Sequence, residues 1–265
     1  MIKKSNTIVL AGGLGNQLYQ LRYFFYLEST GKDVKIDSFS GFIFDRDFNR
    51  KSRLAVILDH KLGVSFFLLF RLLRFLKFPY IRYINFLIEN SPNNLSNKNA
   101  LKSYHIGYWQ QDILKFNRFD QEICRLIDNK FKVDSIPFKI GDDSIALCLR
   151  AYEEFPEWHQ KSLIRIDEIL KELIEKHSKK FKSIFVISDK PNIRVTSILR
   201  EEFENVVECN SDNGWNDWTT INLIGAFHNI AVTQSSLYDW GVKLARYRLK
   251  SGENLNVYFE EKYLG

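Results

Sequence analysis

Cysteine is scarce in this sequence, since 265 residues include only Cys124, Cys148 and Cys209. The three are far apart, odd in number and without the spacing of zinc ligands. A disulfide framework and a cysteine-based zinc site are therefore excluded. We expect three reduced, mostly buried thiols in a protein of the cytoplasm.

Long uninterrupted apolar runs are also missing. The amino-terminal segment Met1–Asn6 precedes an apolar stretch that is too short for the core of a signal peptide. Internal repeats, low-complexity segments and nucleic-acid-binding motifs are absent as well, so nucleic acid is not an expected partner.

The most apolar stretch, residues 64–88, predicts a helix that breaks at Pro79. Arg71, Arg74 and Lys77 interrupt it every three residues, which argues against a transmembrane span. We favour a core helix whose basic side chains reach solvent. The alternative is a helix that lies on an anionic membrane, which would place the protein at the inner face of the inner membrane.

The overall composition is that of a globular protein, with 45% hydrophobic and 26% charged residues. The length allows one large domain or two small ones. A net charge of +6 favours anionic partners such as nucleotides, phosphates or an acidic membrane surface.

A glycine-rich turn follows the first predicted strand. The apolar, β-branched segment Thr7–Ala11 reads as a buried strand, and Gly12, Gly13 and Gly15 follow it at once. From Asn16 the apolar residues take helical spacing. A strand, a glycine turn and a helix start together predict an anion or nucleotide site, because free N–H groups point out of the helix.

This turn has three interpretations. Gly13 and Gly15 fit a dinucleotide fingerprint, and Asp37 ends a predicted second strand where a ribose-binding acid would lie, although Leu18 occupies the third glycine position. A tight turn without a ligand is the second interpretation. The third is that Gly12–Gln20 forms part of a longer and rarer signature.

The second half of the chain alternates strands with helices, which predicts a parallel sheet with ligands at the carboxyl ends of its strands. The predicted strands are 144–149, 183–188, 206–209, 230–233 and 254–259. The predicted helices between them are 166–181, 192–203, 217–228 and 236–249.

Polar residues stand at the ends of these strands. Arg150 follows the first of them, and an arginine at such a position can grip a diphosphate. Ser188 and Asp189 follow the next strand. Ser235 and Ser236 open a predicted helix, where their hydroxyls can cap the helix and bind phosphate.

Five segments cover nearly the whole chain in one order and spacing: Gly12–Gln20, Gly107–Gln110, Cys148–Glu153, Ile184–Asp189 and His228–Gly241. Together they resemble the α-1,2-fucosyltransferases (glycosyltransferase family 11), whose amino-terminal signature is GGLGNQ. The family's H-x-R-R-G-D segment reads Cys-Leu-Arg-Ala-Tyr-Glu here and keeps only the first arginine and the carboxylate position. The resemblance is therefore to a divergent member.

The resemblance implies an α/β, GT-B-like fold of two Rossmann-like domains whose parallel sheets face a cleft. Residues 1–135 would form the acceptor-side domain and residues 136–265 the nucleotide-sugar domain. The implied reaction is an inverting transfer of L-fucose from GDP-β-L-fucose to a hydroxyl of a glycan, with an α-1,2 linkage. It needs no cofactor and no obligatory metal. The pathway would be surface polysaccharide synthesis, with an acceptor that can be lipid-linked.

The resemblance also assigns residues. Arg150 would neutralise the leaving diphosphate, and Glu153, Glu154 and then Asp189 are the candidates for the base. The expected donor-binding residues are Gly13, Gly15, Asn16, Gln17, Arg150, Ser188, Asp189, Ser235 and Ser236. The expected acceptor-binding residues are Tyr108 and Trp109, in one of the resembling segments, and Trp158 and His159, in an expected loop over 155–159 that is rich in groups able to stack on a sugar.

A metal site is not expected at Asp45-Arg46-Asp47, although this segment matches the D-x-D pattern of some sugar transferases. Its basic flank makes local ion pairing the simpler explanation. Two rival functions stay open. One is an NAD-dependent oxidoreductase that uses the glycine turn and Asp37, and the other is a non-catalytic protein that binds a GDP-sugar.

Overall fold

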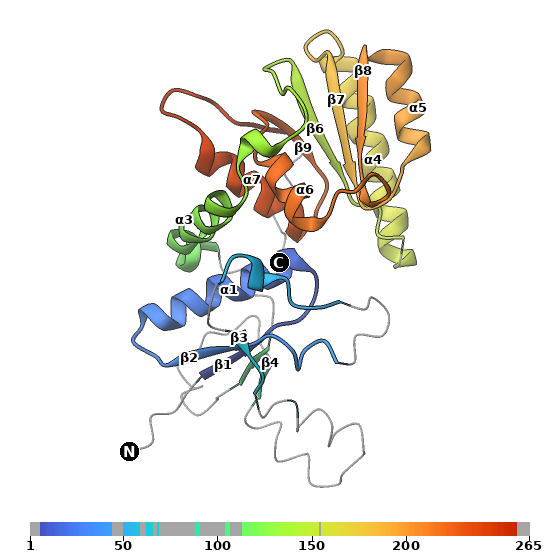
Figure 1. Ribbon diagram of the computed structural model, residues 1–265. Helices are drawn as coiled ribbons and strands as arrows, with labels where there is room; N and C mark the ends of the chain where they lie inside the picture. Colours follow the sequence, from blue (N-terminus) through green and yellow to red (C-terminus); the bar gives the residue numbers. More distant parts are fainter. Residues whose placement is uncertain are drawn as a thin grey trace, which may run out of the picture. The chain divides into compact units, whose positions relative to one another are not determined.

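The computed structural model describes residues 6–43, 50–58, 62–65, 68, 88–90, 104–106, 113–153 and 155–258 (Figure 1). The chain divides into two compact units, Met1–Leu126 and Ile127–Gly265. The division falls within a helix, whereas the sequence analysis placed the boundary after residue 135.

Unit 1 is built around a five-stranded parallel sheet in the order β3-β2-β1-β5-β4. Its strands are β1 (Asn6–Val9), β2 (Val34–Asp37), β3 (Leu62–Gly63), β4 (Ile88–Asn90) and β5 (Tyr104–Ile106). The other elements are α1 (Leu14–Ser29), the short 3₁₀ helix η1 (Leu54–Val56) and α3 (Ile113–Lys130), which continues into unit 2.

Unit 2 also has a five-stranded parallel sheet, in the order β10-β9-β6-β7-β8. Its strands are β6 (Ser144–Leu149), β7 (Ser183–Ser188), β8 (Asn205–Cys209), β9 (Asn229–Val232) and β10 (Asn256–Tyr258). Its helices are α4 (Pro156–His177), α5 (Ile193–Glu202), α6 (Asp217–Ile224) and α7 (Ser236–Arg248), with the 3₁₀ helices η4 (Val133–Ser135) and η5 (Ser211–Asn213).

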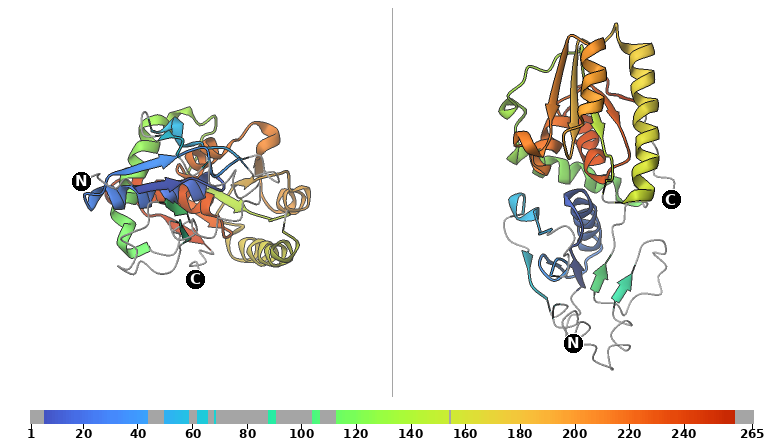
Figure 2. Two further views of the ribbon diagram at one scale, coloured as in Figure 1. Left: turned by 90° about the horizontal axis from the view of Figure 1, so that it is seen from below. Right: turned by 90° about the vertical axis from the view of Figure 1, so that its right-hand side faces the viewer.

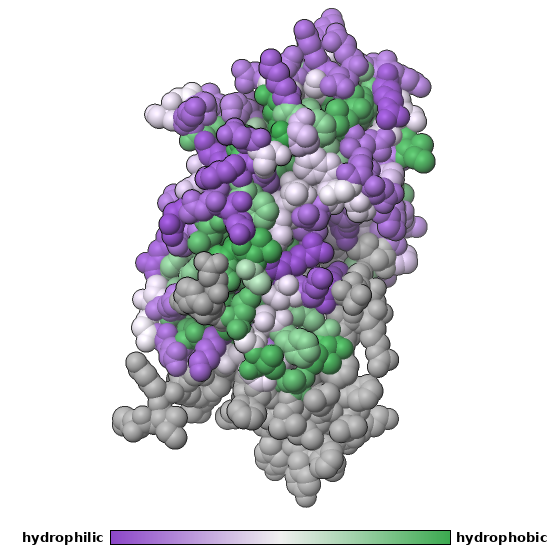
Figure 3. Space-filling view, viewed as in Figure 1, coloured by the Kyte–Doolittle hydropathy of each residue, from purple (hydrophilic) through white to green (hydrophobic). Residues whose placement is uncertain are grey.

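Helices cover both faces of the unit 2 sheet (Figures 1 and 2). Along β6, Ile145 and Leu147 pack with α4 and α5, whereas Ala146 and Cys148 pack with α6 and α7. Successive side chains of a strand point to opposite faces, so a strand buried on both faces must be apolar throughout. The apolar groups are enclosed between the helix layers, and much of the face of unit 2 seen in Figure 3 is hydrophilic.

β6 lies at the topological switch point of this sheet. The chain passes from β6 to β7 and β8 on one side, and β9 and β10 lie on the other. In doubly wound sheets, ligands bind at the carboxyl ends of the strands where the order reverses. The turn after β6 and the turn after β9 flank that place.

Two predicted helices are wrong in their bounds. The helix expected over 217–228 ends at Ile224 and is followed by its C-cap, Gly225. The helix expected over 166–181 begins at Pro156 and ends at His177, so Trp158 and His159 lie in its first turn rather than in a loop. Phe155, with extended backbone, is the N-cap, and Pro156 is favoured at the first helical position because it has no N–H to pair. The apolar spacing of the helix begins only later, which explains the error.

The three cysteines are free and buried, as expected. Within the described ranges, no helix is long and apolar enough to cross a membrane. Nearly all of the predicted helix 64–88 lies outside the described residues, so its two interpretations stay predictions.

Candidate functional site

Two turns meet at the switch point of unit 2. The backbone N–H of Arg150, after β6, donates to Thr233 Oγ1, after β9, at 2.7 Å. Thr233 Oγ1 in turn donates to the carbonyl of Cys148 at 3.2 Å. Two residues on, the Tyr152 hydroxyl donates to the carbonyl of Gln234 at 2.7 Å. These hydrogen bonds hold the turn with Arg150 against the start of α7.

The Arg150 guanidinium lies between two side chains. One of its nitrogens forms an ion pair with the carboxylate of Asp189, which follows β7. Its Cζ also lies 5.0 Å from the centre of the Tyr152 ring, within the range of a cation–π interaction. The sequence-predicted Arg150 and Asp189 are thus brought together at adjacent strand ends.

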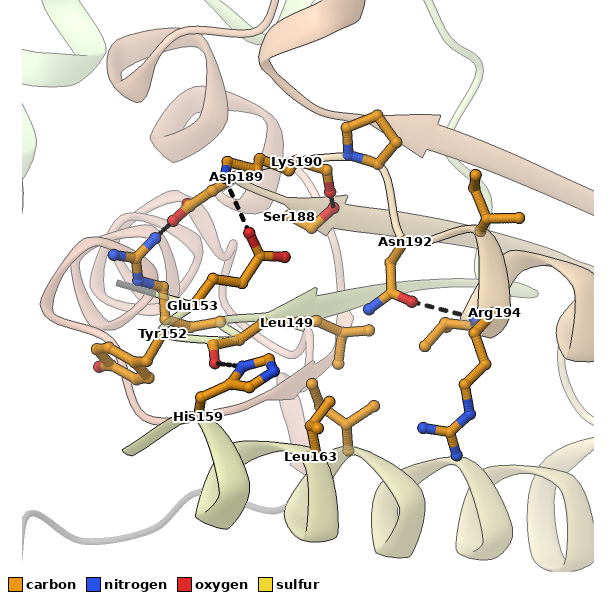
Figure 4. A pocket seen from close by; sticks show the side chains of 16 residues that line it. Leu149, Tyr152, Glu153, His159, Leu163, Ser188, Asp189, Lys190, Asn192 and Arg194 are labelled. Carbon is orange, nitrogen blue, oxygen red and sulfur yellow. Dashed lines mark hydrogen bonds and ion pairs between the residues drawn. The ribbon is translucent and has the colours of Figure 1, made fainter. Parts of the chain in front are cut away.

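A cavity of about 400 Å³ opens beside this pair. It lies where α4 and α5 begin, over the carboxyl ends of β6 and β7 (Figure 4). Figure 4 shows Glu153, Asp189 and Lys190 close to one another, with Leu163 on the side of α4. Its lining includes these predicted site residues: Arg150, Glu153, His159, Ser188 and Asp189.

Glu153 was the first candidate for the base. Its carboxylate accepts a hydrogen bond from Lys190 Nζ at 2.9 Å. That bond lowers the pKa of Glu153, because it stabilises the charged form. Glu153 is therefore ionised at neutral pH but is a weaker base than an unpaired glutamate. Glu154, the second candidate, lies outside the described residues.

The two predicted acceptor contacts on α4 differ in their surroundings. His159 Nδ1 lies 2.7 Å from the carbonyl of Ala151, which fixes its ring at the cavity. Trp158 is 56% exposed and packs its ring 5.5 Å from that of Tyr152. An exposed indole beside a polar cavity provides a flat apolar surface. The other two predicted acceptor contacts, Tyr108 and Trp109, lie outside the described residues.

The predicted serine contacts occupy different positions. Ser188 Oγ donates to the carbonyl of Lys190 at 2.7 Å and so shapes the turn after β7. Ser235 is the N-cap residue of α7, but its side chain makes no capping hydrogen bond, so the capping role expected for it is wrong. Ser236 is the first helical residue of α7. Both lie at the helix start beside the Arg150 turn, where the helix dipole favours an anion.

The glycine turn of unit 1 is held by its own glutamines. Gln17 is buried, and its Nε2 donates to the carbonyls of Gly12 at 3.0 Å and Lys51 at 3.1 Å. Its Oε1 accepts the N–H of Arg53 at 2.9 Å. Gln20 Oε1 accepts the N–H of Ala11 at 3.1 Å. Both N–H groups of the Gln17 amide are therefore used inside unit 1, which favours a structural role over the predicted donor contact.

The glycines of this turn are not equivalent. Gly12 has a φ of 78°, which a glycine adopts without strain. Gly13 is the N-cap of α1 with a φ of −70°, and a Cβ added to it would meet no atom within 4 Å. Nothing within unit 1 thus requires glycine at that position. Gly15 is buried in α1, and Asn16 beside it is partly buried.

Asp37, the acid of the dinucleotide interpretation, is buried. Its carboxylate accepts five hydrogen bonds, from the N–H of Phe39 and from the N–H and hydroxyl groups of Ser40 and Ser65. These bonds fix the loops that follow β2 and β3. A carboxylate used in this way is not available to a ribose, which argues against the oxidoreductase alternative.

A metal site is not found in the described part of the chain, since no group of three or more His, Cys, Asp or Glu side chains there could hold an ion. The Asp45-Arg46-Asp47 segment lies outside it.

Each of the two units has a parallel sheet. The first strand of unit 1 leads into the glycine-rich turn, and the first strand of unit 2 leads into the turn with Arg150. This arrangement is an α/β fold of the GT-B-like class. Comparison with solved structures confirms this fold. The crystal structure of POFUT1 in complex with GDP matches with a TM-score of 0.52 and 10% identity, over 97% of this chain and 98% of that one. POFUT1 in complex with GDP-fucose gives a TM-score of 0.48 and 11% identity, over 97% of each chain.

No family model and no curated protein matches the sequence. At these identities the likeness to POFUT1 concerns the fold, and it does not single out the α-1,2-fucosyltransferases.

Three residues of the site were not predicted from the sequence. Lys190 pairs with Glu153, Thr233 receives the Arg150 N–H, and Tyr152 contacts Arg150 and Gln234. All three lie within two residues of a predicted site residue in the sequence, so their positions indicate them as neighbours of the site.

Proposed function

We propose that this protein is an inverting glycosyltransferase that transfers L-fucose from GDP-β-L-fucose to a hydroxyl of a glycan. The observation that carries the proposal is the placement of Arg150 beside the start of α7 at the switch point of unit 2. The chain aligns over nearly its full length with POFUT1 in complex with GDP, which supports a GDP-sugar as donor. Unit 2 would hold the nucleotide sugar and unit 1 would serve the acceptor.

Arg150 would neutralise the charge that grows on the GDP leaving group as the glycosidic bond breaks. Such stabilisation is strongest for a group that is already positioned, and the bonds from Arg150 to Thr233 and from Tyr152 to Gln234 position it. The N–H groups and hydroxyls of Ser235 and Ser236 would bind phosphate oxygens at the start of α7. Gly13, with open space in place of a side chain, and Asn16 would be the unit 1 contacts to the donor.

Inversion requires a group that accepts the proton of the attacking hydroxyl. Glu153 is ionised and lines the cavity, so it is our first candidate, and Glu154 is the second. Proton transfer to Glu153 would be more favourable if the acceptor displaced Lys190, because the hydrogen bond from Lys190 lowers the pKa of Glu153.

The acceptor would be a glycan of surface polysaccharide synthesis that can be carried on a lipid at the cytoplasmic face of the membrane, and the new linkage would be α-1,2. The sugars of the acceptor would contact the exposed ring of Trp158 and the side chain of His159, which lines the cavity. They would also contact Tyr108 and Trp109. Residues 64–88 would provide any contact with an anionic membrane. The reaction as proposed uses no cofactor and no metal.

One observation favours a second candidate, a GDP-sugar-binding protein without turnover. The Arg150 guanidinium is paired with Asp189, and Ala151 stands where the resembled segment has its second arginine. A donor would have to compete with Asp189 for the one arginine that this segment keeps.

The test is a transfer assay with GDP-β-L-fucose, GDP-mannose and UDP-galactose, each with a panel of galactose-terminated oligosaccharides. We expect GDP release from GDP-β-L-fucose that depends on an acceptor, and a product with an α-fucosyl linkage by NMR. Preference for UDP-galactose, or a β-linked product, would contradict the proposal. GDP binding without turnover for any acceptor would favour the second candidate.

A further inference from the structure

Tyr152 has an unusual backbone for its residue type. Its φ is 51°, and among the described residues it is the only one other than glycine with a positive φ. L side chains adopt this region rarely, because Cβ approaches the backbone oxygen. The H-x-R-R-G-D segment that residues 148–153 resemble has a glycine at this position, which would adopt the same backbone without strain.

The side chain of Tyr152 makes contacts that a glycine lacks. Its ring lies beneath the Arg150 guanidinium at 5.0 Å, and its hydroxyl donates to the carbonyl of Gln234 at 2.7 Å. The centre of the Trp158 ring, in α4, lies 5.5 Å from the centre of the Tyr152 ring. Tyr152 is thus anchored at both ends, to α4 and to the turn before α7.

These contacts bear on Arg150 in particular. Asp189 follows β7 and pairs with the guanidinium on that side of β6, whereas β9 and the start of α7 lie on the other side of β6. The Tyr152 ring limits how far the guanidinium can turn, and the bond to Gln234 ties that ring to the β9 side. A glycine at this position would remove the contact between the ring and the guanidinium.

We propose that Tyr152 is a positioning residue that holds the Arg150 guanidinium at the switch point, so that a nucleoside diphosphate can exchange places with Asp189. This inference rests on the proposed function of the site. Tyr152 acts through Arg150 and does not itself contact the donor.

The test is a double-mutant cycle of GDP affinity by calorimetry with Arg150→Ala, Tyr152→Gly and the double variant. Glycine suits the observed φ, so Tyr152→Gly keeps the fold. We expect Tyr152→Gly to weaken GDP binding about tenfold in the presence of Arg150, and to change it less than twofold in the Arg150→Ala background. Tyr152→Phe keeps the ring and loses one hydrogen bond, so we expect about a threefold loss.

Equal losses in both backgrounds would overturn the inference, because Tyr152 would then act independently of Arg150. Unchanged GDP affinity in Tyr152→Gly, with only a change in melting temperature, would show a purely structural role. A loss in Tyr152→Phe as large as that in Tyr152→Gly would also overturn the role of the ring. Absence of GDP binding by the unsubstituted protein would instead contradict the proposed function.

Discussion

Each unit has an aspartate at the carboxyl end of its second strand, and the two aspartates differ in burial and in hydrogen-bond partners. Asp37, at the end of β2, is 1% exposed and accepts five hydrogen bonds from its own unit. The side chain of Asp189, after β7, is 43% exposed and pairs with Arg150 at the edge of a cavity. Both carboxylates stand where ligands bind in parallel sheets.

The difference shows that position at a strand end does not make a site by itself. In unit 1 the polar groups of the turn and strand end, Gln17, Gln20 and Asp37, are buried and satisfy backbone groups. In unit 2 the charged groups pair with one another at the surface, and a ligand can replace such partners at a smaller cost. Substitutions in unit 1 should therefore lower stability, and those in unit 2 should lower binding or turnover.

Asp37→Ala should be the most damaging change. Removing the carboxylate leaves several buried donors without an acceptor, which costs about 3 kcal/mol or more in the free energy of unfolding. Urea unfolding followed by circular dichroism measures this. Asp33→Ala, the same change at an exposed position, should alter stability by less than about 0.5 kcal/mol. If the Asp37→Ala protein were stable but lost NAD binding, Asp37 would be a ligand contact, and the binding site would lie in unit 1 instead of unit 2.

Arg150→Ala should leave the fold intact and lower turnover, or GDP affinity, at least tenfold. A charge-assisted contact contributes about 1.5–3 kcal/mol, and about 1.4 kcal/mol corresponds to a factor of ten. The matched control is Arg200→Ala, which removes a surface arginine paired with Glu208 at 3.2 Å in the same unit. Near-normal turnover in Arg150→Ala, or an equal loss in Arg200→Ala, would remove Arg150 from the mechanism.

Trp158→Ala should raise KM for the glycan acceptor about threefold to tenfold and leave KM for GDP-fucose unchanged, because aromatic stacking contributes about 0.5–1.5 kcal/mol. Tyr247→Ala, which removes another exposed aromatic side chain at the far end of α7, serves as the control. If KM for GDP-fucose rises instead, Trp158 supports the donor side through its contact with Tyr152.

Lys190→Met should have the smallest effect on stability. The hydrogen bond from Lys190 lowers the pKa of Glu153, so this pair stabilises the protein above the ordinary pKa of a glutamate. That contribution is lost as pH falls through the lowered value, and it is below about 1 kcal/mol because the pair is exposed. NMR titration of the Glu153 carboxyl should show its pKa rising in Lys190→Met. An unchanged pKa would mean that Lys190 is not the cause.

Much of the fold could be predicted because its signals are local. The strands 144–149 and 183–188 were predicted with the bounds that the structure has, since each is a short apolar run between turn residues, and the predicted second strand ends at Asp37 as expected. The start of α4 was missed because Pro156 and Phe155 mark it through capping, before the apolar spacing begins. The parallel direction of the strands in unit 2 followed from the alternation of strands and helices, whereas the strand order and the switch point are findings of the structure.

The site was predictable only in part, because its geometry depends on residues far apart in the sequence. Arg150 and Asp189 were expected at neighbouring strand ends, and the structure brings them together. The hydrogen bonds from Arg150 to Thr233 and from Tyr152 to Gln234 join turns some 80 residues apart, at separations of 83 and 82. The structural use of Gln17 and Asp37 also could not be read from the sequence, since burial decides it.

We expect unit 2 to bind guanosine diphosphate through Arg150 at its switch point. Calorimetry with GDP, UDP and NAD on the unsubstituted protein and on Arg150→Ala measures this binding. GDP should bind more tightly than UDP or NAD, and Arg150→Ala should weaken GDP binding at least tenfold. Binding of NAD that is indifferent to Arg150→Ala would contradict this expectation and would move the site to the glycine turn of unit 1.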